Sequence, residues 1–270
     1  MTVPTATLTL ESSSRSRARL GDAVRSEWTK LWTVRSSWLN VASALVLAAL
    51  LGLQFGIGTA YNNDHPEPGQ LVAPQPVGGF GLSAVLILQV IVAAFALLPV
   101  TSEYATGSIR STLQWTPVRR NVVQAKAVVL APVLFVYGLL LATVAAVAGG
   151  LMAGSWADWD LRPLVTDLLS VAFYLTAAGL FSLGIAWILR STAGTLTAAF
   201  LLLMVLPMML GQSGLRTLVW IAAFLPGGAG QNFLSRSTDP ISPTLSVVVL
   251  LAWTAAALVT GTRVLTRRDA

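Results

Sequence analysis

The chain has 270 residues, of which 55% are hydrophobic and only 10% are charged, and its formal net charge is +6. A water-soluble domain carries charges on about 25% of its residues, so this composition leaves too little polar surface to face water and indicates a protein that crosses a membrane several times. Because the sequence holds no cysteine and a single histidine, disulfide bonds, thiol chemistry and thiolate metal sites are excluded.

The segment before the first apolar run divides into two predicted parts. Residues 1–19 lack periodic apolar positions, which predicts a disordered cytoplasmic tail. In residues 20–37 the apolar side chains recur at helical spacing and gather in one arc, whereas Lys30 lies on the polar side. Trp28 and Trp32 on the apolar arc suit the lipid–water boundary. We therefore expect an amphipathic elbow helix, with a plain extension of the first span as the alternative.

Six apolar segments are long enough to cross a hydrocarbon core, which needs roughly 20 helical residues. Residues 215–230 follow the fifth segment and are too few to span, so we expect a re-entrant or interfacial piece there. The fold class expected is an all-α membrane protein, with a six-span transmembrane domain over residues 38–262 and a cytoplasmic tail at 263–270. The predicted spans are residues 38–58, 80–100, 127–153, 164–189, 195–210 and 241–261.

The positions of lysine and arginine predict the orientation of the spans. With the N-terminus in the cytoplasm, the inner segments hold 14 of the 17 basic residues, which is the asymmetry that the positive-inside rule describes. Both termini are therefore expected on the cytoplasmic side. The basic residues are interpreted as topology determinants and contacts for anionic head groups, and not as a nucleic-acid surface, which needs a basic patch on a folded soluble domain.

The predicted spans are almost free of ionisable side chains, with Asp167 near the outer end of the fourth as the exception. Intramembrane charges usually mark ion pathways or proton relays, so the pattern argues against an ion-coupled carrier and against an intramembrane hydrolase. Gln54 and Gln89 are candidates for lining a pathway, and Gln89 alternatively bonds a neighbouring helix. His65 lies in the outer loop beside two carboxylates, a set too weak to predict a metal site.

A polar island, residues 101–126, interrupts the apolar chain on the predicted cytoplasmic side. It reads TSEYATGSIRSTLQWTPVRRNVVQAK. Thr116 and Pro117 are residue types preferred at the N-cap and the first position of a helix. We therefore expect a short helix, a corner presented to the cytoplasm, and a second helix that runs from Pro117 into the third span. The island is interpreted either as an ordinary basic loop or as a docking element that receives force from a soluble motor.

The sequence contains no GxxxxGK[ST] phosphate-binding loop. The chain is therefore not expected to be an enzyme or to bind a cofactor of its own, and any ATP would be bound by a partner subunit.

Two stretches resemble the permease subunits of ABC exporters of the ABC-2 type, most closely the small six-span permeases of actinobacteria. They are VRSEWTKLWTVRSSW before the first span and EYATGSIRSTLQWTPVRRNVVQAKAVV after the second. The resemblance implies an elbow helix that includes Trp28 and Lys30, six spans, and a coupling helix that docks on a separate ATP-binding subunit. It assigns six residues to the coupling region: Glu103, Tyr104, Gly107, Ile109, Arg110 and Leu113.

The resemblance leads us to expect an export permease in the bacterial plasma membrane. Its expected partners are a cytoplasmic ABC ATPase, a second permease subunit in a homodimer or heterodimer, and the lipid bilayer. The alternative is a non-transporting membrane anchor or regulatory subunit that recruits a cytoplasmic partner. The polar island suits both functions equally.

Overall fold

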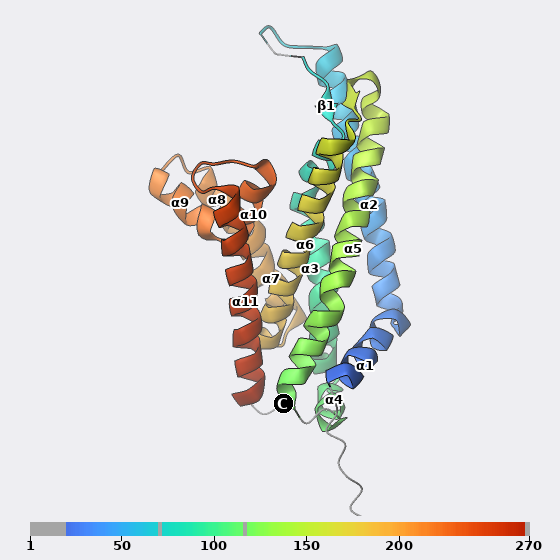
Figure 1. Cartoon of the computed structure of the whole chain (residues 1–270), viewed down its shortest axis with the longest axis vertical. Helices are drawn as coiled ribbons and strands as arrows, with labels where there is room; N and C mark the ends of the chain where they lie inside the picture. Colours follow the sequence, from blue (N-terminus) through green and yellow to red (C-terminus); the bar gives the residue numbers. More distant parts are fainter. Residues whose placement is uncertain (1–19, 70–71, 116–117, 268–270) are drawn as a thin grey trace, which may run out of the picture.

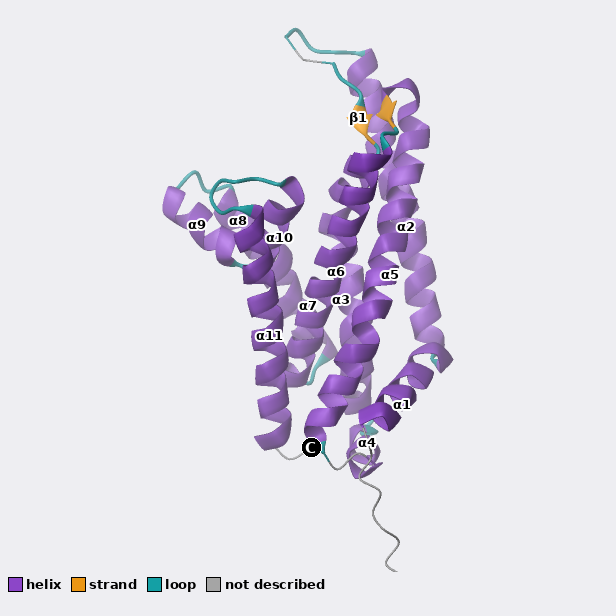
Figure 2. Ribbon diagram, in the orientation of Figure 1, coloured by secondary structure: helices purple, strands orange, loops and turns teal. Residues whose placement is uncertain are grey.

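Long apolar helices that run nearly side by side form most of the molecule (Figures 1 and 2). The computed structural model describes residues 20–69, 72–115 and 118–267, and within these ranges six helices are long and apolar enough to cross a membrane. This confirms the predicted all-α membrane fold. The six are α2 (Arg35–Asp64), α3 (Gly78–Ala105), α5 (Arg119–Ala153) with a short 3₁₀ turn (Gly154–Trp156), α6 (Leu161–Leu189), α7 (Thr192–Phe200) continued through a π-helical turn (Leu201–Val205) into α8 (Leu206–Gly211), and α11 (Pro243–Arg267).

The shorter elements lie at the two ends of these helices. At one end, α1 (Leu20–Thr33), α4 (Ile109–Trp115) and the last turn of α11 lie together, and we call this the α1–α4 end (Figure 1). Toward the other end lie α9 (Arg216–Phe224) and α10 (Pro226–Ser235), together with two short parallel strands, β1 (Gln75–Pro76) and β2 (Ala157–Asp158).

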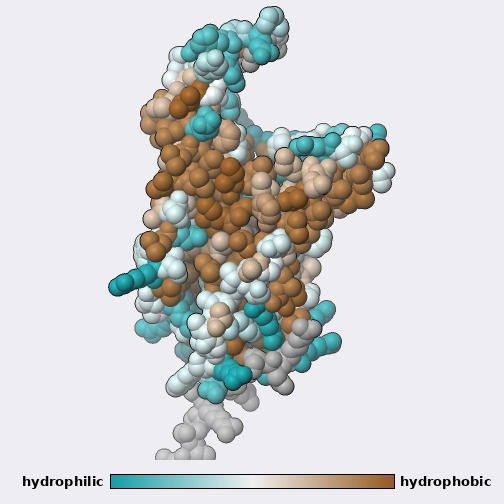
Figure 3. Space-filling model, turned by 180° about the vertical axis from the view of Figure 1, so that it is seen from behind, coloured by the Kyte–Doolittle hydropathy of each residue, from teal (hydrophilic) through white to brown (hydrophobic). Residues whose placement is uncertain are grey.

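Helices α3 and α6 form the centre of the bundle. The apolar stretches of these two helices are 56% and 61% buried, against 22% for α2 and for the α7–α8 span. A helix that is apolar all round yet mostly exposed needs an apolar solvent. Hydrophobic side chains accordingly cover the middle of the molecule and hydrophilic ones gather at its ends (Figure 3), as expected for a protein surrounded by lipid.

A stripe of small residues brings α2 and α5 into close contact. A Cβ atom added to Gly52 would lie 2.2 Å from the carbonyl oxygen of Ala145, and one added to Gly56 would lie 2.2 Å from that of Gly149. Such close approach lets two membrane helices gain dispersion contacts that larger side chains would prevent. The stripe consists of the fully or almost fully buried Ala44, Ala48, Gly52 and Gly56, spaced four residues apart.

The fifth span carries a wide turn whose cause is visible in the sequence. Pro207 has no N–H group, so it cannot bond the carbonyl of Leu203 four residues earlier, and the chain there forms a π-helical turn instead. The carbonyl oxygen of Leu203 faces α10, where a Cβ atom added to Gly227 would lie only 1.9 Å from it. Only glycine allows the backbone of α10 to approach this turn.

Two details of the polar island differ from the prediction. Residues 102–105 continue the second span as part of α3, and the short helix is only the seven residues of α4, because the chain turns at Gly107 with φ +73°. Glycine adopts that backbone conformation without the steric cost that other residues bear. The next helix, α5, begins at Arg119, and the predicted helix start at Thr116 and Pro117 lies outside the described residues.

Residues 215–230, expected to be re-entrant or interfacial, form α9 and the first half of α10. These helices are 9 and 10 residues long and separate at Leu225, which is extended. Each is too short to cross a membrane, for which roughly 20 residues are needed.

Adding one methyl group to the α2–α5 contact tests the stripe of small residues. We expect Gly52→Ala to lower the melting temperature of the purified protein in detergent, because its Cβ atom would overlap the backbone of α5 and overpacking costs about 1–3 kcal/mol. Gly58→Ala, on the same helix with open space around it, should be neutral or slightly stabilising, since alanine is favoured over glycine in helices. Equal effects of the two substitutions would contradict the close contact.

Candidate functional site

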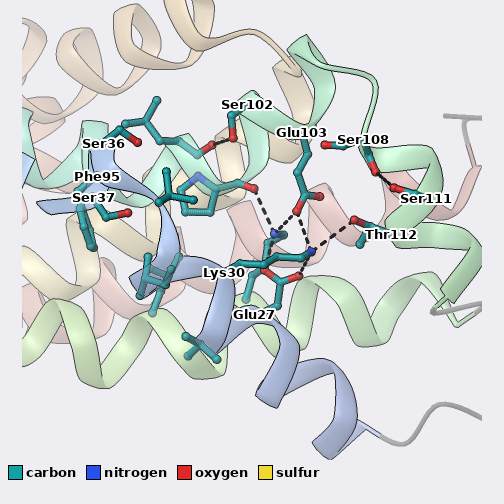
Figure 4. A pocket seen from close by; sticks show the side chains of 17 residues that line it. Glu27, Lys30, Ser36, Ser37, Phe95, Ser102, Glu103, Ser108, Ser111 and Thr112 are labelled. Atoms are coloured by element: carbon teal, nitrogen blue, oxygen red, sulfur yellow. Dashed lines mark hydrogen bonds and ion pairs between the residues drawn. The ribbon is translucent and has the colours of Figure 1, made fainter. Parts of the chain in front are cut away.

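Four charged side chains meet at the α1–α4 end, and we call them the charge cluster: Glu27 and Lys30 of α1, Glu103 of α3 and Lys126 of α5. The Nζ atom of Lys126 lies 2.6 Å from Oε2 of Glu27 and 2.9 Å from Oε1 of Glu103. It also donates a hydrogen bond of 3.1 Å to the carbonyl oxygen of Pro99. The cluster therefore joins three helices that are far apart in the sequence (Figure 4).

Helical spacing explains how each element presents its part of the cluster. Glu27 and Lys30 are three residues apart on α1, so their side chains are neighbours and form an ion pair of 2.8 Å. Pro99 and Glu103 are four residues apart on α3 and therefore share one face. Both face Lys126, which is in the second turn of α5.

Burial makes the pairing of Lys126 decisive for the stability of this end. Its side chain is 1% exposed, and those of Glu27 and Glu103 are 8% and 11% exposed. A buried ammonium group is tolerated only when its charge is compensated and its three N–H donors are bonded. The two carboxylates and the Pro99 carbonyl meet both requirements.

The electrostatic balance favours the ionised form of both α1 members of the charge cluster. Burial opposes ionisation of the Glu27 carboxyl, but Lys126 and Lys30 outweigh it through charge and hydrogen bonds, so the pKa of Glu27 is lowered. Burial likewise disfavours the charged form of Lys30, yet its contacts with Glu27 and Glu103 raise its pKa. One carboxylate oxygen of the cluster is unsatisfied. The Oε2 atom of Glu103 is buried and accepts no hydrogen bond from the described residues.

Lys30 extends the cluster to the short helix α4. Its Nζ atom lies 3.1 Å from Oε1 of Glu103 and 3.4 Å from Oγ1 of Thr112. The Lys30 side chain is 42% exposed, so solvent screens these contacts and each contributes little energy. Their importance is geometric, because through them the Lys30 ammonium group of α1 contacts both α3 and α4.

Tyr104 connects the end of α3 with the end of α6. The guanidinium carbon of Arg190 lies 5.0 Å from the centre of the Tyr104 ring, a cation–π distance. The ring also meets Trp187 edge-on, with 6.2 Å between ring centroids. Arg190 ends α6 in a left-handed backbone conformation, at φ 55°.

The other residues assigned to the coupling region divide between the inside and the outside of this end. Ile109 is 3% exposed and anchors α4 on the core. Leu113 is half-buried against the same core, whereas Arg110 is exposed. Gly107 forms the turn before α4 and is open to solvent. Trp115 at the end of α4 is 82% exposed.

The elbow tryptophans pack on one another along the surface. Trp28 is 48% exposed and meets the half-buried Trp32 edge-on at 5.7 Å, while Trp32 lies 5.3 Å from Trp38. The predicted apolar arc of α1 is therefore displaced from its buried face, which consists of Ala23, Glu27 and Leu31.

Sequence reasoning missed two members of the cluster. The basic residues were interpreted as topology determinants and head-group contacts, whereas Lys126 is 2% exposed and bonds two carboxylates. Glu27 was not singled out. The available signal was Glu27 itself, since a carboxylate beside the apolar face of an amphipathic helix calls for a buried cation.

The described residues line two cavities of several hundred Å³, and one of these cavities adjoins the charge cluster. This elbow cavity has a volume of about 380 Å³ and is enclosed by α1, the start of α2, α3, α4 and α5. The other has a volume of about 430 Å³ and lies between α3, α6, α8 and α10. The described residues contain no group of three or more His, Asp or Glu side chains placed to hold a metal.

The two predicted pathway glutamines have different surroundings. Gln89 is 1% exposed, accepts a hydrogen bond from the Tyr174 hydroxyl through Oε1, and lines the second cavity. Gln54 is exposed on the outer side of α2. Gln89 therefore bonds a neighbouring helix and borders a cavity at the same time.

Comparison with known proteins identifies one family. A family model described as ABC-2 family transporter protein matches residues 23–208, which is more than two thirds of the chain. The match includes all four residues of the charge cluster, four complete spans and most of the fifth. A search of curated proteins finds no match.

Removing the buried ammonium group tests the charge cluster. We expect Lys126→Met to destabilise the protein by about 3–5 kcal/mol, because two buried carboxylates then lose their buried cation and keep only the partly exposed Lys30, and a lower melting temperature in detergent would show it. Adding Glu27→Gln and Glu103→Gln to Lys126→Met should restore part of the loss. Arg120→Met, an exposed position on the same helix, is the control, and a Lys126→Met protein as stable as this control would refute the assignment.

Proposed function

The chain belongs to the ABC-2 family of transporter proteins, and from this premise we propose that it is an export permease subunit that couples to a separate ATP-binding subunit. The proposed assembly contains two permease subunits, identical or different, and ATP is bound by the partner and not by this chain. Family membership favours a permease over the alternative of a non-transporting membrane anchor.

The charge cluster is the observation that carries the coupling proposal. Lys30 contacts α4 at Thr112 and α3 at Glu103, and Glu103 shares Lys126 with Glu27. A displacement of α4 would therefore change ion pairs that hold α1, α3 and α5 together. The buried, unbonded Oε2 atom of Glu103 costs about 1–3 kcal/mol in this arrangement, which favours a second arrangement in which that oxygen is bonded.

The outer face of α4 has the properties of a docking surface. Ile109 fixes the helix to the core, while Arg110 and Trp115 remain exposed. Tryptophan and arginine are the residues most often found to dominate binding energy in protein interfaces. The lone tryptophan at the tip, 82% exposed, is a natural anchor for a pocket on the ATP-binding subunit.

The distribution of basic residues supports a cytoplasmic position for the α1–α4 end. This end carries the exposed Arg25, Arg35, Arg110 and Arg120, and also Arg267 at the end of α11. Basic segments are retained on the cytoplasmic side during insertion. We place both termini there, facing a soluble ATPase.

The second cavity supports a substrate path along α3 and the fifth span. Its described lining combines amides and hydroxyls, among them Gln89, Tyr174, Gln212 and Gln231, with leucine and methionine side chains. Wide π-turns are frequent at functional sites, and the one in the fifth span precedes the α8 wall of this cavity. Movement of α3, which also carries Glu103, would reach the cavity directly.

Substitution at the tip of α4 tests the docking surface. We expect Trp115→Ala to reduce co-purification of the ATP-binding subunit and substrate-stimulated ATP hydrolysis by tenfold or more, since interface anchors contribute roughly 2 kcal/mol or more. Trp220→Ala, at a partly exposed tryptophan on α9, should leave both measurements unchanged. Wild-type coupling in Trp115→Ala would exclude this face of α4 as the docking site.

Reporter fusions test the orientation. A reporter that is active only in the cytoplasm should be active when fused after Arg267 and inactive when inserted at Pro68 in the exposed loop between α2 and β1. The reverse pattern would overturn the proposed topology.

A further inference from the structure

We propose that the elbow cavity binds a glycerophospholipid whose head group carries both a phosphate and a primary ammonium, as phosphatidylethanolamine does. The inference concerns binding by the permease alone and does not depend on coupling to an ATP-binding subunit.

The cavity is amphipathic. Its lining combines apolar side chains, among them Leu31, Phe95 and Leu98, with hydroxyl groups from α2, α3 and α4. Its volume of about 380 Å³ lies within the range of roughly 300–1,000 Å³ that ligand pockets occupy. A head group and the upper part of an acyl chain fit such a space, and the remaining chain would extend into the bilayer.

The position of the cavity points to a lipid and not to a soluble molecule. It lies at the elbow, where the chain leaves α1 at Thr33, extends through Val34 and enters the first span at Arg35. Trp38 donates a hydrogen bond of 3.0 Å to the carbonyl of Trp32 beside this corner, and tryptophans mark the level of lipid head groups. The mouth of the cavity is therefore at head-group depth.

The charges of the lining favour a zwitterion over an anionic lipid. Among the described lining residues the ionisable side chains are those of the charge cluster, two lysines and two glutamates, so their charges cancel. Lys30, the more exposed lysine, already contacts both Glu27 and Glu103. No uncompensated cation in this set is left to attract a head group with net negative charge.

Hydroxyl groups line the cavity at two separate places. Ser36 and Ser37 lie in the first turn of α2, whose N-cap residue Val34 provides no side-chain acceptor. The N–H group of Ser37 is already bonded to the Val34 carbonyl at 3.1 Å, so we assign the phosphate to the hydroxyl groups of Ser36 and Ser37, near the positive end of the α2 dipole. In contrast, Ser102 donates its proton to the Leu98 carbonyl at 2.6 Å, so its oxygen remains as an acceptor for the ligand.

The same holds on α4, where Ser111 donates to the Ser108 carbonyl at 2.8 Å. Figure 4 shows Ser36 and Ser37 toward one side of the cavity and Ser108 and Ser111 toward the other. A primary ammonium has three N–H donors to give to such oxygens, as the lysine ammonium does. A choline head group has none, which separates phosphatidylethanolamine from phosphatidylcholine.

Lipid binding to the purified, delipidated full chain tests the proposal. Native mass spectrometry with phosphatidylethanolamine, phosphatidylcholine and phosphatidylglycerol of identical acyl chains should show about tenfold tighter binding of the first, which corresponds to about 1.4 kcal/mol. Free phosphoethanolamine, the soluble head group, should bind far more weakly than the lipid. Equal binding of phosphatidylcholine, preference for phosphatidylglycerol, or equal binding of the free head group would each overturn the proposal.

Two variants locate the site. Ser36→Ala combined with Ser37→Ala should weaken binding at the phosphate side, with the exposed Ser43→Ala on the same helix as its control. Leu98→Trp should block the apolar side, and Ile87→Trp, at a position of α3 that is 41% exposed and outside the cavity, should not. If Leu98→Trp does not fold, the serine pair and the lipid comparison still decide. Unchanged selective binding in the folded variants would place the lipid elsewhere and refute the proposal.

Discussion

The structure depends on one requirement, that an ammonium group removed from water must find compensating charge and three hydrogen-bond acceptors. For Lys126 these come from Glu27 on α1 and from Pro99 and Glu103 on α3. The requirement sets the position of the elbow helix against the bundle, because apolar contacts alone would let an amphipathic helix slide or rotate on an apolar surface. A single buried lysine thus determines how three elements meet.

Different physical interactions dominate at two places in the molecule. Toward the α2–α5 contact and the π-turn, helices approach until backbone meets backbone, which glycine and alanine allow. At the α1–α4 end, paired charges and aromatic contacts join α1, α3, α4, α5 and α6. Close backbone contacts tolerate little displacement, whereas the partly exposed Lys30 has several partners, Glu27, Glu103 and Thr112, within hydrogen-bond distance. This contrast is consistent with a bundle that moves from the end where the ATP-binding subunit is proposed to dock.

Hydrophobicity and residue type predicted much of this architecture. The six spans follow from apolar length, because a backbone in lipid has to satisfy its hydrogen bonds within a helix. The turn at Gly107 did not follow from the sequence, since positive φ at a glycine is permitted but not required. The charge cluster was predicted only in part: the resemblance pointed to Lys30 and Glu103, but nothing along the chain paired Lys126 with Glu27, 99 positions away. A charged residue considered alone is expected at the surface.

The sequence by itself determined that the protein is surrounded by lipid, how many spans it has, and that residues 101–126 are polar. These properties depend on composition and local pattern. Only the tertiary structure decided which charges of that segment face inward and which outward. Helix packing buries Glu103 and Lys126 as an ion pair and leaves Arg110 and Trp115 on the surface. The physical reason is that burial of a charge depends on partners brought together by helix packing, and such pairing leaves no periodic trace along the chain.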